Sequence, residues 1–422
     1  MLGLAYIREN KDSIIEGLSK RNFDAETLIN QIIQLDILKR SEQTKLERQL
    51  AEGNKIAKNI ASLFKSGDNE AANKLKNESA SIKLKTKKFQ EKLNEIEKKL
   101  FSLQTQIPNV PDKSVQKGIS EKDNQEVYRN KKEINLPKNF LSHWELAKKY
   151  NIIDFELGNK ITGSGFPVYK GKGARLQRGL IQFFLDKNIS AGYEEYQVPL
   201  LVNYDSGYGT GQLPDKDGQM YHSELSDLYL IPTAEVPLTN LYRNVLLNEN
   251  DLPICMTAYT PCFRREAGSY GSDVRGLNRL HQFDKVEIVR LETPQKAMSA
   301  LDEMVNHVKN ILSDLELPYR ILKLCGADLG FTSALTYDFE IYSAAQNKWL
   351  EVSSVSIFNS FQAERLKLRF KSNKGVKKPV YTLNGSALAL PRVLAGLLEN
   401  FQSENKIKIP KTLIPYVGFD SI

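Results

Sequence analysis

The sequence contains 422 residues, with 59 basic and 51 acidic side chains and a formal net charge of +8. A chain of this length can form two or three domains, and its charge suits a polyanionic partner without naming one. Its three cysteines are widely spaced and indicate neither a disulfide framework nor a zinc site, so we expect a reducing, cytoplasmic location. No segment has the length of a membrane span or the apolar core of a signal peptide, so no membrane contact is expected.

Two long helices are predicted within the first hundred residues, from Ala25 to about Lys65 and from Asp68 to about Gln104. Apolar residues recur at alternating spacings of four and three in both, which predicts an antiparallel two-stranded coiled coil. A helix of about 40 residues would form a rod of roughly 60 Å. The predicted seam consists of Leu46, Leu50, Gly53, Ala57, Ile60 and Phe64 in the first helix and of Phe89, Leu93, Ile96, Leu100 and Leu103 in the second.

The charge of the two predicted helices is uneven. Residues 71–100 contain nine lysines and four glutamates, whereas residues 41–70 are balanced. A solvated coiled coil, a helix pair that binds another protein and a phosphate-binding arm would all carry such lysines, and the sequence leaves these open. For a phosphate-binding arm the candidate contacts are Lys76, Lys83 and Lys87.

The segment from residue 107 to residue 124 contains two prolines and a glycine, which predicts a linker. A short amphipathic helix is expected over 141–152, where His143 is predicted to be structural because nothing nearby offers it a partner. A second helix is expected over 173–188, and a strand over 193–202.

A long hairpin is predicted between Thr257 and Glu292, because two strand-like runs flank a glycine-bearing segment over 267–277. Side chains two apart share one face of a strand, and here that face combines arginines, carboxylates and an aromatic ring. Guanidinium groups bind phosphate oxygens, a phenyl ring stacks on a base, and carboxylates accept from amino groups. The pattern indicates a nucleoside triphosphate site, with a solvated strand face as the alternative. The residues of this face are Cys262, Arg264, Glu266, Arg279, His281, Phe283, Lys285 and Glu287.

Several segments resemble the motifs of class II aminoacyl-tRNA synthetases, in the form characteristic of seryl-tRNA synthetases. FRREAGSYG, RGLNRLHQF and DKVE resemble motif 2, LIPTAEVPLTN the TAE loop, EVSS the magnesium-binding element and TLNGSALALPR motif 3. The helix and strand over 173–202 resemble motif 1, with Pro199 as its proline. The resemblance implies an α+β fold with a central antiparallel sheet flanked by helices, behind an N-terminal antiparallel helical hairpin.

The resemblance also implies a reaction and its site. L-serine and ATP would form seryl-adenylate and pyrophosphate, and the seryl group would pass to the terminal adenosine of tRNA(Ser); whether tRNA(Sec) is also charged is left open. Catalysis would depend on Arg264, Glu266 and Arg392, and magnesium would bind Glu351 and Ser354 with the nucleotide phosphates. Serine would contact Thr233, Ala234, Glu235, Arg264, Glu287 and Ser386. ATP would contact Arg264, Arg265, Glu266, Arg279, Phe283, Glu351, Val352, Ser353, Ser354 and Arg392.

The implied organisation is a tRNA-binding arm over residues 1–106, a linker over 107–124 and a catalytic domain over 125–422. Motif 1 implies a homodimer in which the arm of one subunit reaches the tRNA charged by the other. Motif 3 departs from the family's common form at Ala387 and Pro391, which puts turnover in question but leaves the spacing from Ser386 to Arg392 intact.

Two other functions remain alternatives. A relative of these enzymes could transfer the aminoacyl group to a carrier other than tRNA, but the long arm counts against it. A non-catalytic coiled-coil protein that binds nucleic acid is opposed by the joint presence of all the motifs.

Overall fold

The computed structural model describes residues 1–215, 218–266 and 275–422, which fall into two units. The first unit comprises residues 1–19 and 23–108, and the second comprises residues 20–22 and 109–422. Asn109 begins the second unit with buried contacts, because its amide nitrogen donates to the carbonyls of Thr332 and Phe358 at 2.8 Å each. Arg21 joins the same unit by donating to the carbonyls of Asn109 and Leu329, also at 2.8 Å.

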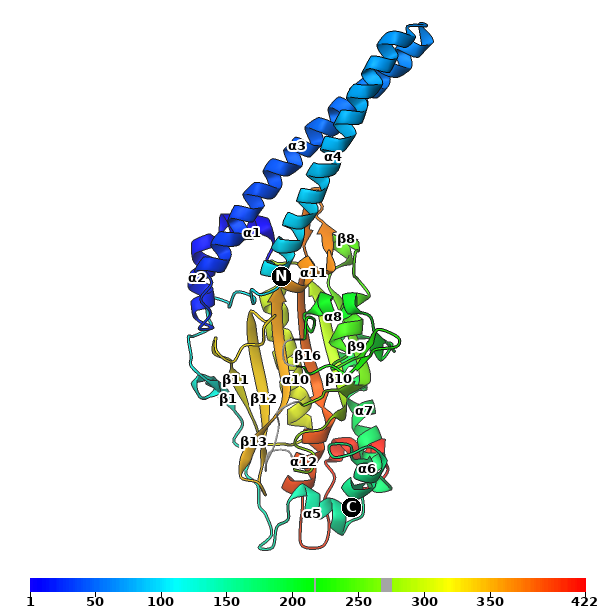
Figure 1. The fold of residues 1–422 in the computed structure, drawn as a ribbon. Helices are drawn as coiled ribbons and strands as arrows, with labels where there is room; N and C mark the ends of the chain where they lie inside the picture. The colour runs from blue at the N-terminus through cyan, green and yellow to red at the C-terminus, as the bar shows by residue number, and fades with distance from the viewer. Residues whose placement is uncertain (216–217, 267–274) are drawn as a thin grey trace. The chain divides into compact units, whose positions relative to one another are not determined.

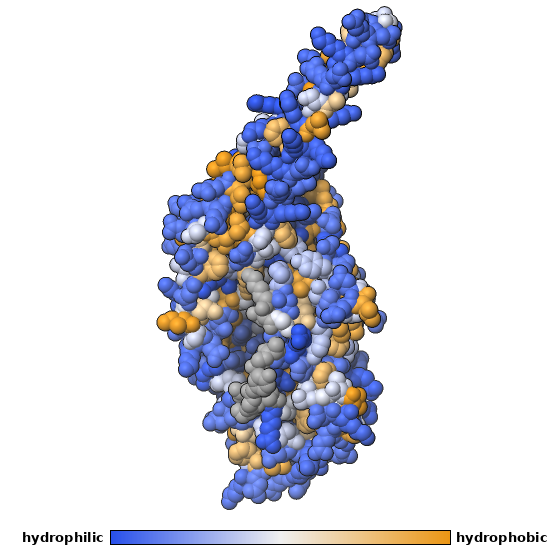
Figure 2. All heavy atoms as spheres, viewed as in Figure 1, coloured by the Kyte–Doolittle hydropathy of each residue, from blue (hydrophilic) through white to orange (hydrophobic). Residues whose placement is uncertain are grey.

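Two long helices dominate the first unit (Figure 1). They are α3 (Glu26–Lys65) and α4 (Asn69–Gln104), preceded by α1 (Leu4–Glu9) and α2 (Lys11–Ser19). The side chain of Asp68 caps α4 by accepting from the Ala71 N–H at 3.1 Å, which satisfies one otherwise unpaired donor of the first turn. The two predicted long helices are therefore confirmed. Hydrophilic residues cover most of their surface (Figure 2).

The predicted seam is correct in α4 but half wrong in α3. Leu50 and Phe64 are 47% and 41% exposed, and the more buried residues lie one position earlier, at Gln49 and Leu63. Ala57 is likewise exposed while Ile56 is buried. Two registers of the three-and-four spacing fit the apolar residues of α3, and the one that occurs admits polar seam positions, which a count of apolar residues overlooks.

One of those polar positions is Glu42, which is only 1% exposed. Its carboxylate accepts from Lys45 of the same helix at 2.9 Å and from Lys92 of α4 at 3.0 Å. These two lysines hold the pKa of Glu42 below its usual value. Because a buried carboxylate is tolerated only when it is paired, Glu42 favours the one register that brings Lys92 opposite it.

An eight-stranded sheet forms the centre of the second unit, and most of its neighbouring strands are antiparallel. The strand order is β1 (Gln125–Arg129), β11 (Tyr319–Lys323), β12 (Leu335–Ser343), β13 (Lys348–Asn359), β16 (Tyr381–Ala389), β10 (Gln282–Glu292), β9 (Ile254–Phe263) and β4 (Glu194–Glu195). Among the described strands of this sheet, only β4 pairs in parallel, with β9.

Smaller sheets and short helices complete this unit. The strand predicted over 193–202 is wrong in extent, because the structure has only β4 and β5 there, in different sheets. Pro199 has no N–H to donate to a neighbouring strand, which accounts for the interruption. The small sheets are β5 (Leu201–Val202), β7 (Leu228–Leu230) and β6 (His222–Ser223); β15 (Lys377–Pro379), β14 (Arg369–Lys371) and β8 (Leu246–Asn248); and β2 (Ile153–Asp154) with β3 (Val168–Tyr169).

Helices pack against the central sheet, and β10 is buried on both faces. Its residues Val286 and Ile288 join a core with α7, α10 and α12, whereas Val289 and Leu291 join a second core with α9 and α11. The expected α+β fold, a helical hairpin and a mainly antiparallel sheet flanked by helices, is confirmed (Figure 1). The helices are α5 (His143–Lys149), α6 (Phe155–Ile161), α7 (Lys172–Ser190), α8 (Tyr204–Thr210), α9 (Glu235–Asn240), α10 (Ala297–Asp314), α11 (Phe361–Leu366), α12 (Leu390–Asn400) and α13 (Ile414–Val417).

A search of the described residues finds no helix with the length and apolarity needed to cross a membrane.

Candidate active site

The predicted hairpin is formed by β9 and β10, and its main-chain pairing extends to the motif 2 arginine, whose N–H donates to the carbonyl of His281 at 2.9 Å. Phe283 lies opposite Cys262 in the ladder, while Arg264 directly follows β9. The guanidinium of Arg264 lies 5.2 Å from the centre of the Phe283 ring. This contact places a cation and an aromatic face together, as expected for a nucleotide site. Residues 267–274 of the predicted connecting segment lie outside the described residues.

Across the end of the hairpin, Arg279 forms an ion pair with Glu266. The side chain of Arg279 is 43% exposed and that of Glu266 is 14% exposed. The guanidinium therefore faces solvent, whereas the carboxylate is largely shielded from it. Arg265 is exposed, and its main-chain N–H donates to the carbonyl of Gln219 at 2.8 Å.

A buried group of charges lies further along β10, around Glu287. The ammonium of Lys285 lies 2.5 Å from a carboxylate oxygen of Glu287, and the hydroxyl of Thr233 donates to the same oxygen at 2.9 Å. All three residues are at most 6% exposed. The Thr233 hydroxyl also accepts from the N–H of Glu235 at 3.2 Å. The same side chain thus bonds to Glu287 and supports the first turn of α9.

Glu235 begins α9 beside this group. Its carboxylate accepts from the amide of Gln362 at 2.7 Å, and the other end of that amide accepts from Thr382 at 2.6 Å. Burial raises the pKa of Glu235 to about 7, and the charge of Glu287 adds to the rise while Gln362 and Lys285 oppose it. With a pKa of about 7, Glu235 titrates near neutrality, and the positive charge of a bound cation would favour its ionised form.

The neighbouring strand β16 brings Ser386 next to this buried group. Ser386 lies directly opposite Glu287 in the β10–β16 ladder and is 8% exposed. Ala234, between Thr233 and Glu235, is fully buried. The pairing of β10 with β16 and the bond from Thr233 to Glu287 thus bring together residues of three distant segments that the motifs imply for serine binding.

The strand β13 presents Glu351 and Ser354 on one side because of a bulge. Ser353 is paired with Phe339 and Glu351 with Glu340, so that Val352 is the extra residue. Without it, residues three apart would point to opposite faces. The hydroxyl of Ser354 donates to the half-exposed carboxylate of Glu351 at 3.3 Å.

The other two residues of this element face inward. Val352 and Ser353 are 1% and 2% exposed, and the Ser353 hydroxyl donates to the Ser386 carbonyl at 2.6 Å. Asp338 pairs with Ser354 across the sheet, and its Oδ1 is buried without a hydrogen-bond partner. Burial, and then the charge of Glu351, raises the pKa of Asp338 well above its usual value.

Arg392 lies in the first turn of α12, directly after Pro391, where a proline is tolerated. Its Nε donates to the main-chain carbonyl of Asn278 at 3.0 Å, and its Nη1 donates to the carbonyl of Glu351 at 2.8 Å. The side chain is one-third exposed. Arg392 thus joins motif 2 to β13 at the open end of the site.

Sequence reasoning missed three residues of this region as site residues: Lys285, Gln362 and Asp338. Lys285 lies two positions before Glu287 on the predicted hairpin face, so an alternating pattern could have found it. Gln362 and Asp338 carry no comparable signal, because their contacts depend on the pairing of distant strands.

The three arm lysines are all exposed. The ammonium of Lys76 lies 4.6 Å from the centre of the Phe64 ring, and that of Lys87 lies 4.0 Å from the Glu91 carboxylate. No cluster of three or more His, Cys, Asp or Glu side chains that could hold a metal occurs among the described residues.

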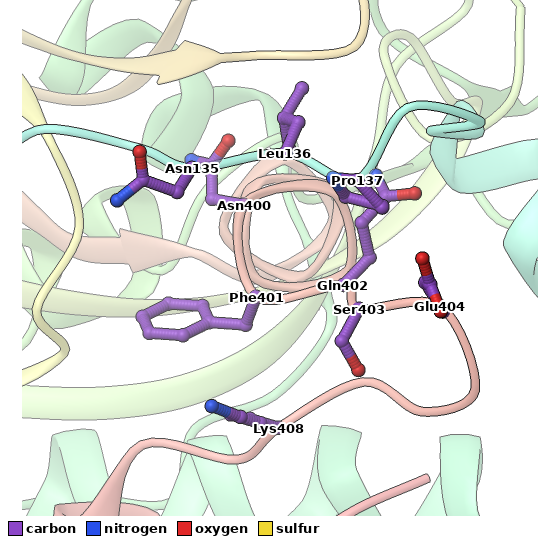
Figure 3. Close-up of a pocket in the computed structure, with 9 residues that line it drawn as sticks. All are labelled: Asn135, Leu136, Pro137, Asn400, Phe401, Gln402, Ser403, Glu404 and Lys408. Carbon is purple, nitrogen blue, oxygen red and sulfur yellow. The ribbon is translucent and has the colours of Figure 1, made fainter.

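A hollow of about 410 Å³ lies apart from the predicted site residues, between the segment 135–137 and the end of α12 (Figure 3). Two of its polar side chains are already engaged, since the Gln402 amide donates to Leu141 and Glu399 and that of Asn400 donates to Tyr342.

Comparison with known proteins gives a consistent result along the chain. Residues 1–111 match the family described as seryl-tRNA synthetase N-terminal domain, and residues 220–401 match the tRNA synthetase class II core domain (G, H, P, S and T). Serine--tRNA ligase from Salinibacter ruber is 45% identical over 424 residues, which cover 100% of this chain and 99% of that protein. The corresponding protein from Akkermansia muciniphila is 42% identical over 433 residues, with the same coverage.

Solved structures agree. Seryl-tRNA synthetase from Pyrococcus horikoshii, crystallised with ATP, matches with a TM-score of 0.90 at 31% identity and covers 100% of this chain and 99% of that one. The cytoplasmic serine-tRNA ligase from Naegleria fowleri, in complex with AMP, shares the fold with a TM-score of 0.86 at 24% identity, covering 100% of this chain and 98% of that one.

Proposed function

The chain belongs to the seryl-tRNA synthetase family, and from this premise we propose that it activates L-serine with ATP and transfers it to tRNA(Ser). The proposal assigns tRNA binding to residues 1–106, a linker to 107–124 and catalysis to 125–422. The observation that carries it is the buried group of side chains around Glu287, whose charges suit a small hydroxylated zwitterion.

The buried group around Glu287 contains two carboxyl groups, those of Glu235 and Glu287, but one lysine, Lys285. Lys285 pairs with Glu287, while Glu235 has no cation within ion-pairing distance among the described residues and is neutral for much of the time at pH 7. The ammonium of serine would supply the missing positive charge. Thr233 and Ser386 supply hydroxyl partners for its polar groups, and Arg264 supplies a cation for its carboxylate. An alanine bound there would leave buried polar groups unpaired, which disfavours it.

The nucleotide would occupy the open end beyond Phe283. We assign base stacking to Phe283, acceptance from the adenine amino group to Glu266, and phosphate binding to Arg264, Arg279 and Arg392. Arg265 and the segment from Glu351 to Ser354 complete this proposed ATP site. The Arg279–Glu266 pair would separate when ATP enters, because each partner then acquires a ligand group.

Glu351 and Ser354 fit magnesium bound together with phosphates. Both offer oxygen ligands on one side of β13, Glu351 is half exposed, and too few protein ligands converge there for a closed cage. When bound, this ion would neutralise phosphate charge. The buried, unpaired Oδ1 of Asp338 lies on the neighbouring strand and favours a cation at this end.

The reaction follows from position and charge. A carboxylate oxygen of serine attacks the α-phosphorus of ATP and pyrophosphate leaves, giving seryl-adenylate. A hydroxyl of the terminal ribose of tRNA then attacks the acyl carbon, and AMP leaves. No side-chain nucleophile is needed, because Arg264 aligns the reacting groups and the arginines take up the charge that develops on phosphate.

The arm and a second subunit would supply the RNA-binding surface. We propose that Lys76, Lys83 and Lys87 contact tRNA and that motif 1 forms a homodimer that binds tRNA across subunits, in the cytoplasm. Exposed apolar residues in the motif 1 region support a subunit contact: Ile189, Leu200, Leu201 and Tyr204. tRNA(Sec) is a further candidate substrate.

The proposal is tested by pyrophosphate–ATP exchange with each of the twenty amino acids, followed by charging of total tRNA. We expect exchange with serine alone and seryl transfer to tRNA. Serine-dependent exchange with label incorporated only into protein would favour the carrier-acylating relative, and absence of exchange would contradict the proposal. Deletion of Glu26 to Gln104 is expected to spare exchange and weaken charging.

A further inference from the structure

Residues 275–277, which lead from motif 2 towards β10, pack closely against α5. Gly276 has φ +67°, and a Cβ at this position would lie 2.2 Å from Nε2 of His143 and 3.0 Å from the Trp144 ring. The guanidinium of Arg275 lies 4.8 Å from the centre of that ring. The N–H of Leu277 donates to His143 Nε2 at 2.8 Å. Only glycine fits at position 276, so the path of this segment is set by His143 and Trp144.

His143 in turn is fixed by a carboxylate on α12, which corrects the prediction that it lacks a partner. It is fully buried, and its Nδ1 lies 2.7 Å from Oε1 of Glu399. Because Nε2 accepts from Leu277, the ring proton lies on Nδ1 and is donated to Glu399. The local sequence gave no sign of this contact, since the two residues are 256 positions apart.

Glu399 is a fully buried anion with several donors. It accepts from the main-chain N–H of His143 at 3.0 Å, from the Ser343 hydroxyl and from the amide of Gln346 at 3.0 Å. Burial alone would raise the pKa of Glu399, but the hydrogen bonds from His143 and Ser343 outweigh it and lower the pKa. The carboxylate is therefore ionised and orients its donors.

Gln346 links this buried group to the active site. Its Nε2 donates to Glu399 and, at 2.8 Å, to Ser343, while its Oε1 accepts from the side-chain amide of Asn278 at 2.8 Å. The main-chain carbonyl of Asn278 accepts from Nε of Arg392 at 3.0 Å. Arg279, the next residue, is the partner of Glu266. Two of the proposed phosphate-binding arginines thus depend on where Asn278 lies.

We propose that Gln346, backed by Glu399 and His143, is a positioning residue that fixes Asn278 and thereby the placement of Arg279 and Arg392 for ATP. This inference rests on the proposed function. The set touches neither proposed substrate, and it lies apart from the serine pocket around Glu287. Its loss is expected to weaken the use of ATP and to leave the use of serine unchanged.

The decisive variant is Gln346→Met, which keeps the length of the side chain and removes its hydrogen bonds. A matched control is Asn400→Leu. Asn400 lies on α12 and bonds to Tyr342 and Ala344, next to the turn that contains Gln346, but no bond joins it to Asn278 among the described residues. In serine-dependent pyrophosphate exchange we expect the KM for ATP to rise about tenfold in Gln346→Met, with the KM for serine within about twofold. Asn400→Leu should keep both values, and the thermal midpoints of the two variants should agree.

Two further measurements separate positioning from a general loss of structure. Amide hydrogen exchange in a peptide spanning residues 275–283 should quicken in Gln346→Met and not in Asn400→Leu. The double variant Gln346→Met/Asn278→Leu should be no worse for ATP than the more impaired of the two single variants, because both remove the same bond.

The outcomes decide separately between this inference and the proposed function. An active unmodified enzyme, combined with an unchanged KM for ATP in Gln346→Met, would overturn the inference alone. Equal rises in the KM values for ATP and serine would also overturn it. An unmodified enzyme without serine-dependent exchange would instead overturn the proposed function.

Discussion

The two ends of the candidate active site are built on opposite principles. At the end proposed for serine, called the serine end, Lys285 and Glu287 are at most 6% exposed and are paired inside the protein. At the end proposed for ATP, called the nucleotide end, the side chains of Arg279 and Glu351 are 43% and 50% exposed. The serine end holds a desolvated ion pair, Lys285–Glu287, whereas the arginine of the Arg279–Glu266 pair at the nucleotide end is open to solvent.

This difference separates selectivity from nucleotide binding. In a desolvated pocket an unmatched polar group is costly, so the serine end can reject a substrate that lacks one hydroxyl. Exposed ion pairs stabilise little, so the arginines of the nucleotide end can leave their carboxylates for phosphates at small cost. Substitutions should therefore affect serine discrimination at the first end and ATP use at the second.

The largest effect is expected where the two ends meet, at Arg264. We predict that Arg264→Ala lowers serine-dependent exchange at least about 1,000-fold, because both reacting groups lose their common cation. Arg129→Ala, which removes a cation on the distant edge strand β1, serves as control. Normal exchange in Arg264→Ala would remove this residue from the site.

The next effect concerns the buried pair. Lys285→Met leaves Glu287 buried without its cation, so the free energy of unfolding should fall by about 3 kcal/mol in a denaturant titration, and serine activation should fall about 100-fold. Lys285→Met/Glu287→Gln removes both charges and should recover much of the stability but not the activity. If the single variant were as stable as the unmodified enzyme, the pair would not have the desolvated character inferred here.

A smaller effect, on pH dependence, is expected from Glu235. Its pKa of about 7 in the folded protein lies above its ordinary value of 4.5, so the folded state holds more protons between these pH values. Its contribution to stability is therefore present below about pH 4.5 and is lost as pH rises to about 7. Because serine's ammonium needs the ionised carboxylate, the KM for serine should rise about tenfold from pH 8 to pH 6. Glu235→Gln should remove this dependence, whereas a profile shared by both proteins would place the titration elsewhere.

The sequence predicted local structure better than it predicted partners. The two long helices and the strands β9 and β10 follow from periodicity, which acts over a few residues. The prediction of the α3 seam was wrong at Leu50, because two registers satisfy the same spacing. The contact between the buried Glu42 and Lys92, which distinguishes these registers, involves two different helices. His143 seemed to lack a partner because Glu399 is distant in the chain.

In the candidate site, the motif residues lie together where the sheet pairs them, as Ser386 lies opposite Glu287. The proximity of Glu351 and Ser354 depends on a bulge, which periodicity cannot show. Lys285 lies on the predicted face, but its burial depends on β9 and β16 pairing on either side of it, which periodicity does not show. Pairing across the sheet thus determines which motif residues are neighbours and which of them are buried, and the motifs alone do not show either.

The smallest effect is expected outside the unit that contains the catalytic candidates, at the three arm lysines. Replacing Lys76, Lys83 and Lys87 by alanine should raise the KM for tRNA several-fold and reduce the slope of log affinity against log salt by about 2 to 3, since each lysine would release about one counterion. Serine-dependent exchange should not change, because it requires no RNA. Lys39→Ala is a suitable control, since Lys39 lies 2.8 Å from Glu97 and its charge is already paired. An unaltered salt slope in the triple variant would show that these lysines only keep the arm solvated, and the RNA contact would then have to be sought on another part of the surface.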